Sequence, residues 1–281
     1  MADDLATYHE NTWCPGCGNF GILNALKRAV VRLEQKGIPR ERLIQTVGIG
    51  CHGKIYDYMA ISGFAALHGR ALAVAQGIKL GNPGLKLLAN VGDGDTLGEG
   101  LEHLVFAAKR NADITALVHN NGVYALTTGQ ATPTSEKGFR GPSTPQGNPE
   151  EPLNPLALML EAGATFVARG YAGKVDHLSE LIVRAVEHEG FSFVDILQPC
   201  VSFNNTYERY NKLTQVMDAT PSTYEEAVAA VKRKDRLLLG VFYENRDKRP
   251  SHFELQGDRV PVMQRPSREQ RQGTVKRLLA P

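Results

Sequence analysis

The sequence predicts an α/β protein with a doubly wound, mostly parallel sheet, because strand-like and helix-like segments alternate along most of the chain. Apolar segments of strand length lie at 43–47, 86–91 and 192–197, and segments with helical spacing of apolar residues separate them. Strands that alternate with helices are typical of parallel sheets. With 281 residues, of which 42% are hydrophobic and 22% charged, the chain can form a substantial core.

Each element is expected from its apolar pattern and its end signals. The first helix covers about 22–33, since Gly37 and Pro39 end the helical spacing. The stretch 127–152 is rich in Gly, Pro, Ser and Thr, and a loop of that length inside a domain is usually functional or disordered. The other elements are expected as strand 43–47, helix 69–80, strand 86–91, helix 97–110, strand 114–119, helix 155–162, strand 165–168, helix 175–189 and strand 192–197.

Residues 206–281 are expected to form a C-terminal appendage to a main domain of residues 1–205. In it, Thr220-Pro221-Ser222 is expected to cap a helix that runs to about Lys234, and 237–243 has a strand pattern. The segment 246–281 carries nine Lys or Arg against four Asp or Glu, so this tail is near +5 and the rest near −3. A basic tail can dock on an acidic partner, but a solvated tail is the more common case.

Charge and hydropathy argue against nucleic-acid and membrane partners. The net charge is +2, and no stretch of 18 apolar residues occurs. Met1-Ala2-Asp3-Asp4 is acidic and lacks the regions of a signal peptide. We therefore expect a cytoplasmic protein with reduced thiols, in which metal or redox roles suit the four cysteines better than disulfides do.

Two polar motifs after neighbouring strands predict a site for a diphosphate and a magnesium ion. Gly92-Asp93-Gly94-Asp95 follows strand 86–91, and Asn120-Asn121 follows the next strand. Ligands of open α/β sheets bind at the carboxyl ends of the strands, and glycines beside Asp93 let backbone approach a diphosphate. The next helix N-terminus suits an anion, and carboxylate and amide oxygens suit Mg²⁺. Taken alone, Gly-Asp-Gly also fits a plain strand–turn–helix junction.

The cysteines form one close pair and two distant singles, and their spacing leaves several roles open. Cys14 and Cys17 form a Cys-x-x-Cys motif, which fits thioredoxin-like, zinc or iron–sulfur chemistry. Structural zinc usually takes two close pairs, and a thioredoxin motif would leave Cys51 and Cys200 without a role. Each of these singles follows a strand, so all four thiols can meet at the sheet edge that carries Asp93. Buried inert cysteines remain the alternative for Cys51 and Cys200.

Together these motifs resemble the β subunit of 2-oxoacid:ferredoxin oxidoreductases. The resemblance spans about Asn11 to Tyr210 and implies a thiamine diphosphate-binding fold of the pyrophosphate type. It is carried by Gly92-Asp93-Gly94-Asp95, Asn121-Gly122-Val123-Tyr124, Gly129-Gln130 and Pro133-Thr134-Ser135, and by the cysteine motifs Trp13-Cys14-Pro15-Gly16-Cys17-Gly18, Gly50-Cys51-His52-Gly53 and Pro199-Cys200-Val201.

The resemblance assigns ligands residue by residue. It implies that Asp93, Asn121 and the Val123 carbonyl hold Mg²⁺. A 4Fe–4S cluster would be held by Cys14, Cys17, Cys51 and Cys200. The residues implied to contact thiamine diphosphate are Ile49, Gly50, Cys51, His52, His68, Gly94, Asp95, Ala125 and Leu126.

Weaker candidates surround these motifs. The resemblance implies that Lys54 pairs with the substrate carboxylate, whereas the alternative is an ordinary surface lysine. His68 is suited to a hydrogen bond with the cofactor or to capping a helix. His52 stands where a smaller residue is common in the family. His177 and His188 are expected to be solvated on their helix.

The resemblance also implies an activity and its partners. The activity is thiamine-dependent oxidative decarboxylation of a 2-oxoacid with coenzyme A to acyl-CoA and carbon dioxide, with electrons passing through the cluster to ferredoxin, in a reversible reaction. The substrate leaning is 2-oxoglutarate, with pyruvate or broad specificity as alternatives. An α subunit is expected to supply the carboxylate for the aminopyrimidine, in a heterodimer or a dimer of heterodimers. Two competing hypotheses are a non-catalytic iron–sulfur subunit and a thiamine decarboxylase without a redox step.

One formal motif match is rejected. Gly48-x-Gly50-x-x-Gly53 follows a strand and matches the dinucleotide fingerprint. That fingerprint expects an acidic residue about 20 positions on, whereas Asp93 is the next acid after Asp57. The segment 56–58 is also expected to be a poor helix start, so an NAD site is not expected.

Overall fold

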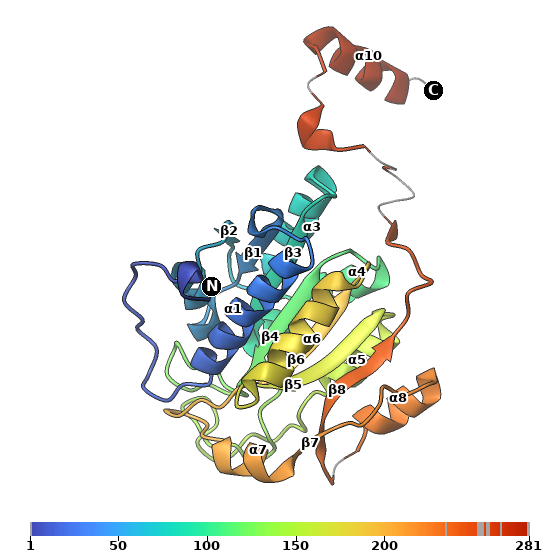
Figure 1. The fold of residues 1–281 in the computed structure, drawn as a ribbon. Coiled ribbons are helices and arrows are strands. Elements are labelled where there is room, and N and C mark those ends of the chain that lie inside the picture. Colours follow the sequence, from blue (N-terminus) through green and yellow to red (C-terminus); the bar gives the residue numbers. More distant parts are fainter. Residues whose placement is uncertain (1, 234, 252–255, 257–258, 265, 280–281) are drawn as a thin grey trace.

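A computed structural model describes residues 2–233, 235–251, 256, 259–264 and 266–279. Its centre is an eight-stranded sheet in the order β2-β1-β3-β4-β6-β5-β8-β7 (Figure 1). The strands from β2 to β5 in that order are parallel, and β8 pairs with β5 in the antiparallel direction. Six strands therefore end at one common edge, and the mostly parallel, doubly wound sheet is confirmed.

The bounds of the elements agree with the expected pattern to within a few residues at most ends. The strands are β1 (Leu43–Val47), β2 (Gly63–Ala65), β3 (Lys86–Gly92), β4 (Thr115–Asn120), β5 (Phe166–Tyr171), β6 (Ser192–Leu197), β7 (Thr214–Val216) and β8 (Leu237–Glu244). The α-helices are α1 (Asn19–Gln35), α2 (Ile55–Tyr58), α3 (Ala71–Gly81), α4 (Leu101–Lys109), α5 (Pro155–Glu161), α6 (Val175–Glu187), α7 (Tyr207–Leu213), α8 (Tyr224–Val231) and α10 (Arg268–Leu278).

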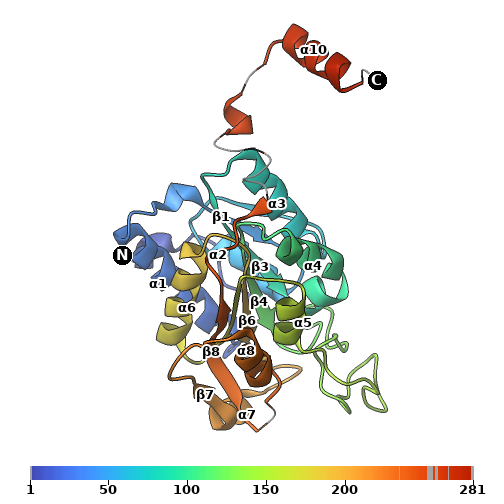
Figure 2. The ribbon, with the colours of Figure 1, turned by 90° about the vertical axis from the view of Figure 1, so that its right-hand side faces the viewer.

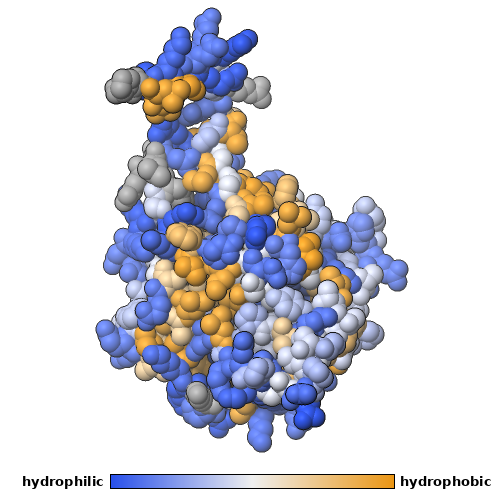
Figure 3. Space-filling model, turned by 180° about the vertical axis from the view of Figure 1, so that it is seen from behind, coloured by the Kyte–Doolittle hydropathy of each residue, from blue (hydrophilic) through white to orange (hydrophobic). Residues whose placement is uncertain are grey.

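Helices cover both faces of the sheet. Figure 2 shows α1 and α6 on one face and α3, α4 and α5 on the other. Two apolar cores result, one between each helix layer and the sheet. Every residue of β4 and β6 is buried, which fits strands that are covered on both faces. Figure 3 shows the side of the molecule that faces away in Figure 1, where apolar patches lie among polar side chains. On the second helix layer, Leu80 of α3 and Phe106 of α4 are partly exposed.

The C-terminal part is joined to the sheet more closely than the sequence suggests. Strand β8 pairs with β5, and β7 pairs with β8, so residues 206–244 extend the sheet. After β8 the chain leaves the sheet, and α10 stands apart from it (Figure 1). No helix among the described residues is long and apolar enough to cross a membrane.

Two local predictions are wrong at the ends of helices. The helix expected to start at Thr220-Pro221-Ser222 begins later, because Thr223 caps α8 by accepting a hydrogen bond from the Glu226 backbone N–H at 3.2 Å. Its expected end, Lys234, lies outside the described residues. The segment after Gly53 does form a short helix, α2, where a poor helix start was expected.

His188 is buried, contrary to the prediction of a solvated histidine. Its side chain is 1% exposed, and Nε2 lies 2.7 Å from Thr165 Oγ1. The periodicity of α6 places residue 188 at the helix end, but the chain turns inward there, because His188 closes the helix with extended backbone. His177, the other histidine of this segment, is half-buried.

Burial of His188 predicts acid sensitivity of the fold. Burial lowers the pKa of His188 to about 4 from an ordinary value of 6.5, so the folded chain keeps it neutral while the unfolded chain takes up a proton. The contribution of neutral His188 to the free energy of unfolding is therefore fully present above pH 6.5 and is lost as the pH falls towards 4. Between pH 7 and pH 5 we expect this group to cost about 2 kcal/mol of unfolding free energy.

The measurement is urea unfolding at pH 7 and pH 5. The loss of stability between these pH values should shrink by about that amount in His188→Gln. The matched control is His9→Gln, since His9 is exposed. An equal pH dependence in His188→Gln and wild type would contradict this role.

Candidate active site

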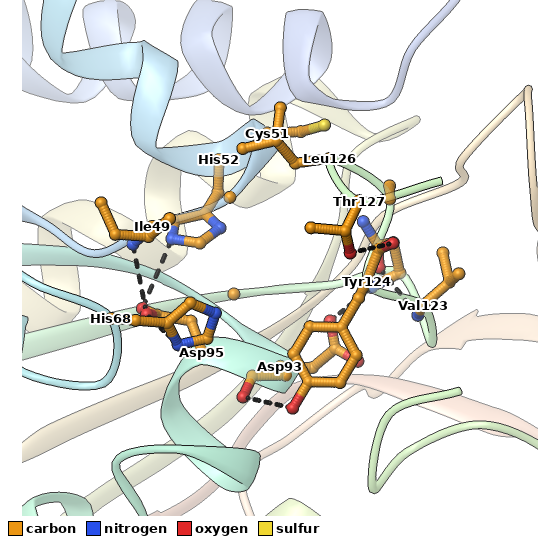
Figure 4. A pocket seen from close by; sticks show the side chains of 15 residues that line it. Ile49, Cys51, His52, His68, Asp93, Asp95, Val123, Tyr124, Leu126 and Thr127 are labelled. Carbon is orange, nitrogen blue, oxygen red and sulfur yellow. Dashed lines mark hydrogen bonds and ion pairs between the residues drawn. The ribbon is translucent and has the colours of Figure 1, made fainter. Parts of the chain in front are cut away.

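Two adjoining pockets lie at the carboxyl edge of the sheet, where the loops after β1, β3, β4 and β6 meet. The first pocket is lined by residues 49–52, 92–95 and 123–127, together with His68 and Asn121. Figure 4 shows Asp93 and Asp95 at one end of this pocket and Cys51 at the other. The second pocket is lined by all four cysteines, and Cys51, Asn121 and Ala125 line both pockets.

The Asp93 carboxylate is held by two hydroxyl groups of the long loop after β4. Thr132 and Thr134 each donate from Oγ1 to Asp93 Oδ2 at 2.6 Å, and the Asn121 backbone N–H donates to Oδ1 at 3.4 Å. Burial raises the pKa of the Asp93 carboxyl, although the hydroxyl donors oppose that rise. A charged carboxylate at this depth is costly unless it is paired, so the position favours a bound cation.

A buried polar chain leads away from Asp93. Thr134 Oγ1 lies 2.9 Å from Asn120 Oδ1, and Asn120 Nδ2 donates to Asp195 Oδ1 at 2.9 Å. Arg169 Nε donates to the other oxygen of Asp195 at 2.9 Å and balances the charge of this fully buried carboxylate. The chain fixes the Asn120 amide and keeps Thr134 next to Asp93.

Asp95 joins three loops around the first pocket. Its Oδ1 accepts hydrogen bonds from the backbone N–H of Gly69 at 2.7 Å and of Ile49 at 3.2 Å. His52 Nε2 lies 3.4 Å from Oδ2, and His68 Nδ1 lies 3.4 Å from Oδ1. Burial alone would raise the pKa of the Asp95 carboxyl, but His52 and the backbone donors hold it below its ordinary value. Asp95 is therefore held as a charged group with one nitrogen of each histidine ring 3.4 Å from its carboxylate.

Glycine is required at two positions in these loops. A Cβ atom at Gly48 would lie 1.9 Å from Asp95 Oδ2, and one at Gly94 would lie 2.3 Å from the Tyr124 ring. Tyr124 in turn donates its hydroxyl hydrogen to the Gly94 carbonyl at 3.1 Å. The turn 94–98 that opens α4 buries Thr96, whose Oγ1 has no hydrogen-bond partner. The loop after β3 thus combines close packing with an available polar atom.

The second pocket gathers the four cysteines from three parts of the chain. Cys17 and Cys200 are buried, Cys51 is partly buried and Cys14 is exposed. Burial raises the pKa of Cys17 to about 11 and raises that of Cys51, and the neighbouring thiols add to both effects. No three His, Cys, Asp or Glu side chains of the described residues form a compact site for a single metal ion.

Hydrogen bonds hold the cysteine segments together. Trp13 Nε1 donates to the Cys51 carbonyl at 2.6 Å, and the Gly18 backbone N–H donates to the Pro199 carbonyl at 3.1 Å. Ser202 Oγ donates to Cys14 Sγ at 3.2 Å. The N-terminal segment is therefore fixed against the loops that carry Cys51 and Cys200.

The residues that the sequence singled out are distributed over the two pockets. All those expected at thiamine diphosphate or Mg²⁺ line the first pocket, namely Ile49, Gly50, Cys51, His52, His68, Asp93, Gly94, Asp95, Asn121, Val123, Ala125 and Leu126. Lys54 lines the second pocket, where its Nζ donates to Thr12 Oγ1 at 3.0 Å.

Several residues of the site were missed by sequence reasoning. Thr134 stands in Pro133-Thr134-Ser135, one of the motifs that carry the resemblance, but no role was assigned to it, and the contact of Thr132 and Thr134 with Asp93, about 40 positions away, was not expected. Asn204, whose side chain donates to the Asn121 carbonyl at 2.8 Å, belongs to none of the motifs. The length of the loop 127–152 and its Thr content were the available signals.

Comparison with known proteins defines the class first. Residues 48–196 match the family described as "Thiamine pyrophosphate enzyme, C-terminal TPP binding domain", and this stretch contains β3, β4 and all the residues that line the first pocket. The chain therefore contains a thiamine diphosphate-binding domain. Residues 200–258 match the family that comprises the C-terminal part of the pyruvate ferredoxin oxidoreductase β chain.

Full-length relatives narrow the class. The chain is 46% identical over 253 residues to a 2-oxoacid:ferredoxin oxidoreductase subunit beta of a Sulfolobus species, covering 84% of this chain and 82% of the relative. It is 40% identical over 200 residues to the 2-oxoglutarate synthase subunit KorB of Archaeoglobus fulgidus, covering 71% and 73%. The chain belongs to the β-subunit family of 2-oxoacid:ferredoxin oxidoreductases.

A solved structure agrees with this assignment. The 2-oxoglutarate:ferredoxin oxidoreductase from Magnetococcus marinus, with 2-oxoglutarate, coenzyme A and succinyl-CoA bound, is similar with a TM-score of 0.90 and 34% sequence identity. The similarity covers 100% of this chain and 96% of that chain.

Proposed function

We propose that the first pocket binds thiamine diphosphate through Mg²⁺, with Asp93, Asn121 and the Val123 carbonyl as the metal ligands. The supporting observation is the buried Asp93 carboxylate, which two hydroxyls hold in a pocket that Asn121 and Val123 also line. Oxygen ligands of these three kinds suit Mg²⁺, which would take further ligands from the diphosphate. Thr96 Oγ1, buried without a partner, is a donor suited to a phosphate oxygen.

The other residues of this pocket would position the cofactor. When bound, thiamine diphosphate supplies an electron sink for the carbon–carbon bond that breaks in decarboxylation. Gly94 and Asp95 would lie along the diphosphate, and His68, whose Nδ1 lies 3.4 Å from Asp95 Oδ1, would hydrogen-bond the cofactor. The contacts with the rest of the cofactor would come from Ile49, Gly50, Cys51, His52, Ala125 and Leu126.

We also assign a 4Fe–4S cluster to Cys14, Cys17, Cys51 and Cys200. The four thiols line one pocket, and four cysteine thiolates are the usual ligands of such a cluster. Iron would hold Cys17 and Cys51 as thiolates, which removes the penalty that raises their pKa values. Because Cys51 also lines the first pocket, the cluster would lie beside the cofactor.

The proposed reaction is the oxidative decarboxylation of a 2-oxoacid. Coenzyme A would take the acyl group and release its thiol proton, carbon dioxide would leave, and two electrons would pass one at a time through the cluster to two ferredoxin molecules. We expect this reaction to be reversible. The KorB relatives and the solved structure favour 2-oxoglutarate, and Lys54 would pair with a substrate carboxylate. Pyruvate or a broader range is the second candidate, because the family matched over 200–258 is named for pyruvate.

An α subunit would complete the active site in the cytoplasm. Thiamine diphosphate enzymes need a carboxylate at the aminopyrimidine, and no glutamate occurs among the described residues that line the first pocket. Two of its apolar residues, Ile49 and Leu126, are nearly half exposed, so the pocket has an open wall that a partner could cover. The relatives named as β subunits support such a partner.

Anaerobic purification of the complex with the α subunit tests this function. We expect a brown protein with about four iron atoms per chain, whose visible absorption bleaches when 2-oxoglutarate and coenzyme A are added. The chain alone should make no acyl-CoA. Pyruvate in place of 2-oxoglutarate tests the second candidate. A colourless complex, or full activity of the chain alone, would contradict the proposal.

A further inference from the structure

Asn204 ends the turn 200–204 and lines neither pocket, but it is hydrogen-bonded to one lining residue of each, Asn121 and Cys200. Through its backbone, Asn204 pairs with Cys200 in both directions, with N–H to carbonyl distances of 2.9 and 3.1 Å. Through its side chain, Nδ2 donates to the Asn121 carbonyl at 2.8 Å. Asn204 is thus bonded at one end to a proposed cluster ligand and at the other to a proposed magnesium ligand.

Close packing supports this contact. Gly122 has a φ of +67°, and a Cβ there would lie 3.0 Å from Asn204 Nδ2. Gly129 has a φ of +109°, and a Cβ there would lie 3.0 Å from the Phe203 ring. Phe203 and Asn204 therefore pack tightly against the loop that begins at Asn121. They can do so because the loop has glycines, which lack a Cβ atom, at the two contact positions.

We propose that Asn204 is a positioning residue that couples the cofactor pocket to the cysteine pocket. This inference rests on the proposed function, because it needs thiamine diphosphate with Mg²⁺ in one pocket and a cluster in the other. The amide fixes the peptide of Asn121 from outside the metal, as outer-shell partners of metal ligands do. The backbone pairing with Cys200 carries any shift of that peptide to the cluster.

The coupling has two consequences. Loss of an outer-shell partner typically lowers metal affinity about 10- to 100-fold, so loss of the Asn204 donor should weaken Mg²⁺-dependent cofactor binding. Coupling between sites is reciprocal, so cofactor binding should in turn alter the cluster. Iron content should stay constant, because Asn204 contacts Cys200 through backbone atoms alone.

The test uses two isosteric variants of the anaerobic complex with the α subunit. Asn204→Asp replaces the donor NH₂ by an acceptor opposite a carbonyl. The matched control is Asn205→Asp, because Asn205 is exposed and its Oδ1 accepts from the Tyr207 backbone N–H, a contact that a carboxylate keeps. A third variant, Asn204→Ala, removes the donor without adding a charge and should give the same result as Asn204→Asp.

Two quantities are measured for each protein, the Mg²⁺ concentration that half-saturates thiamine diphosphate binding and the midpoint potential of the cluster with and without the bound cofactor. In Asn204→Asp we expect the Mg²⁺ requirement to rise about tenfold and the effect of the cofactor on the potential to vanish, at unchanged iron content. Asn205→Asp should behave as wild type. Equal values in Asn204→Asp and Asn205→Asp would overturn the coupling. A wild-type complex without iron or without cofactor binding would overturn the proposed function itself.

Discussion

Replacing Asp93 by asparagine is expected to abolish Mg²⁺-dependent binding of thiamine diphosphate. The variant keeps the shape of the side chain but removes the charge that the two threonine hydroxyls orient. Loss of an outer-shell partner alone costs about 10- to 100-fold in metal affinity, so loss of a charged ligand should cost at least about 100-fold. Calorimetric titration of the cofactor at several Mg²⁺ concentrations gives the affinity.

The same variant should leave the cofactor-free protein at least as stable as wild type. Burial raises the pKa of Asp93, so its charge favours the unfolded chain, and this cost grows as the pH rises from the unfolded-state pKa to the folded-state pKa. Asparagine removes that cost, and the melting temperature without cofactor should stay equal or rise. The stabilisation that added cofactor and Mg²⁺ give to wild type should disappear.

Asp176→Asn is the control for the change of charge. Asp176 is exposed in the first turn of α6, a helix that covers the sheet, and forms an ion pair with Arg28. Neither residue lines the first pocket. Its cofactor affinity should equal that of wild type. Retention of Mg²⁺-dependent binding in Asp93→Asn would remove Asp93 from the metal site.

The fold and the centre of the site could be predicted from the sequence because both depend on local patterns. Strands β1 and β6 have the expected bounds, since both are short, apolar and separated from helices by clear breaks. Asp93 and Asn121 lie together because parallel strands end at one edge, and that edge is fixed once the alternation of strands and helices is known. The apolar patterns and the spacing of the two motifs that predict this edge lie within about 30 residues of one another.

The remainder of the site depends on long-range packing that no local pattern encodes. Thr134 reaches Asp93 only because the loop after β4 folds back, and Arg169 joins the same chain through Asp195 on the neighbouring strand of the sheet. His188 was wrongly expected in solvent for the same reason. Helical spacing describes a residue within a helix, whereas tertiary contacts decide the burial of the residue that ends it.

Replacing Cys17 by serine is expected to remove the proposed 4Fe–4S cluster and to leave cofactor binding unchanged. Cys17 lines the second pocket and not the first. Its loss should therefore lower the iron content from about four atoms to near zero, while the affinity for thiamine diphosphate stays within about threefold of wild type. Iron analysis, the visible spectrum and the cofactor titration on one preparation give the three quantities.

This variant is decisive because the two sites are held by different side chains. With cofactor bound but no cluster, oxidation of the substrate has no electron acceptor, so acyl-CoA formation should stop. Asp93→Asn should show the converse, with iron retained and cofactor absent, since Asp93 lines the first pocket and not the second. If Cys17→Ser kept its iron, Cys17 would be a buried inert thiol. Its pKa, raised to about 11 by burial, would then keep it protonated at neutral pH.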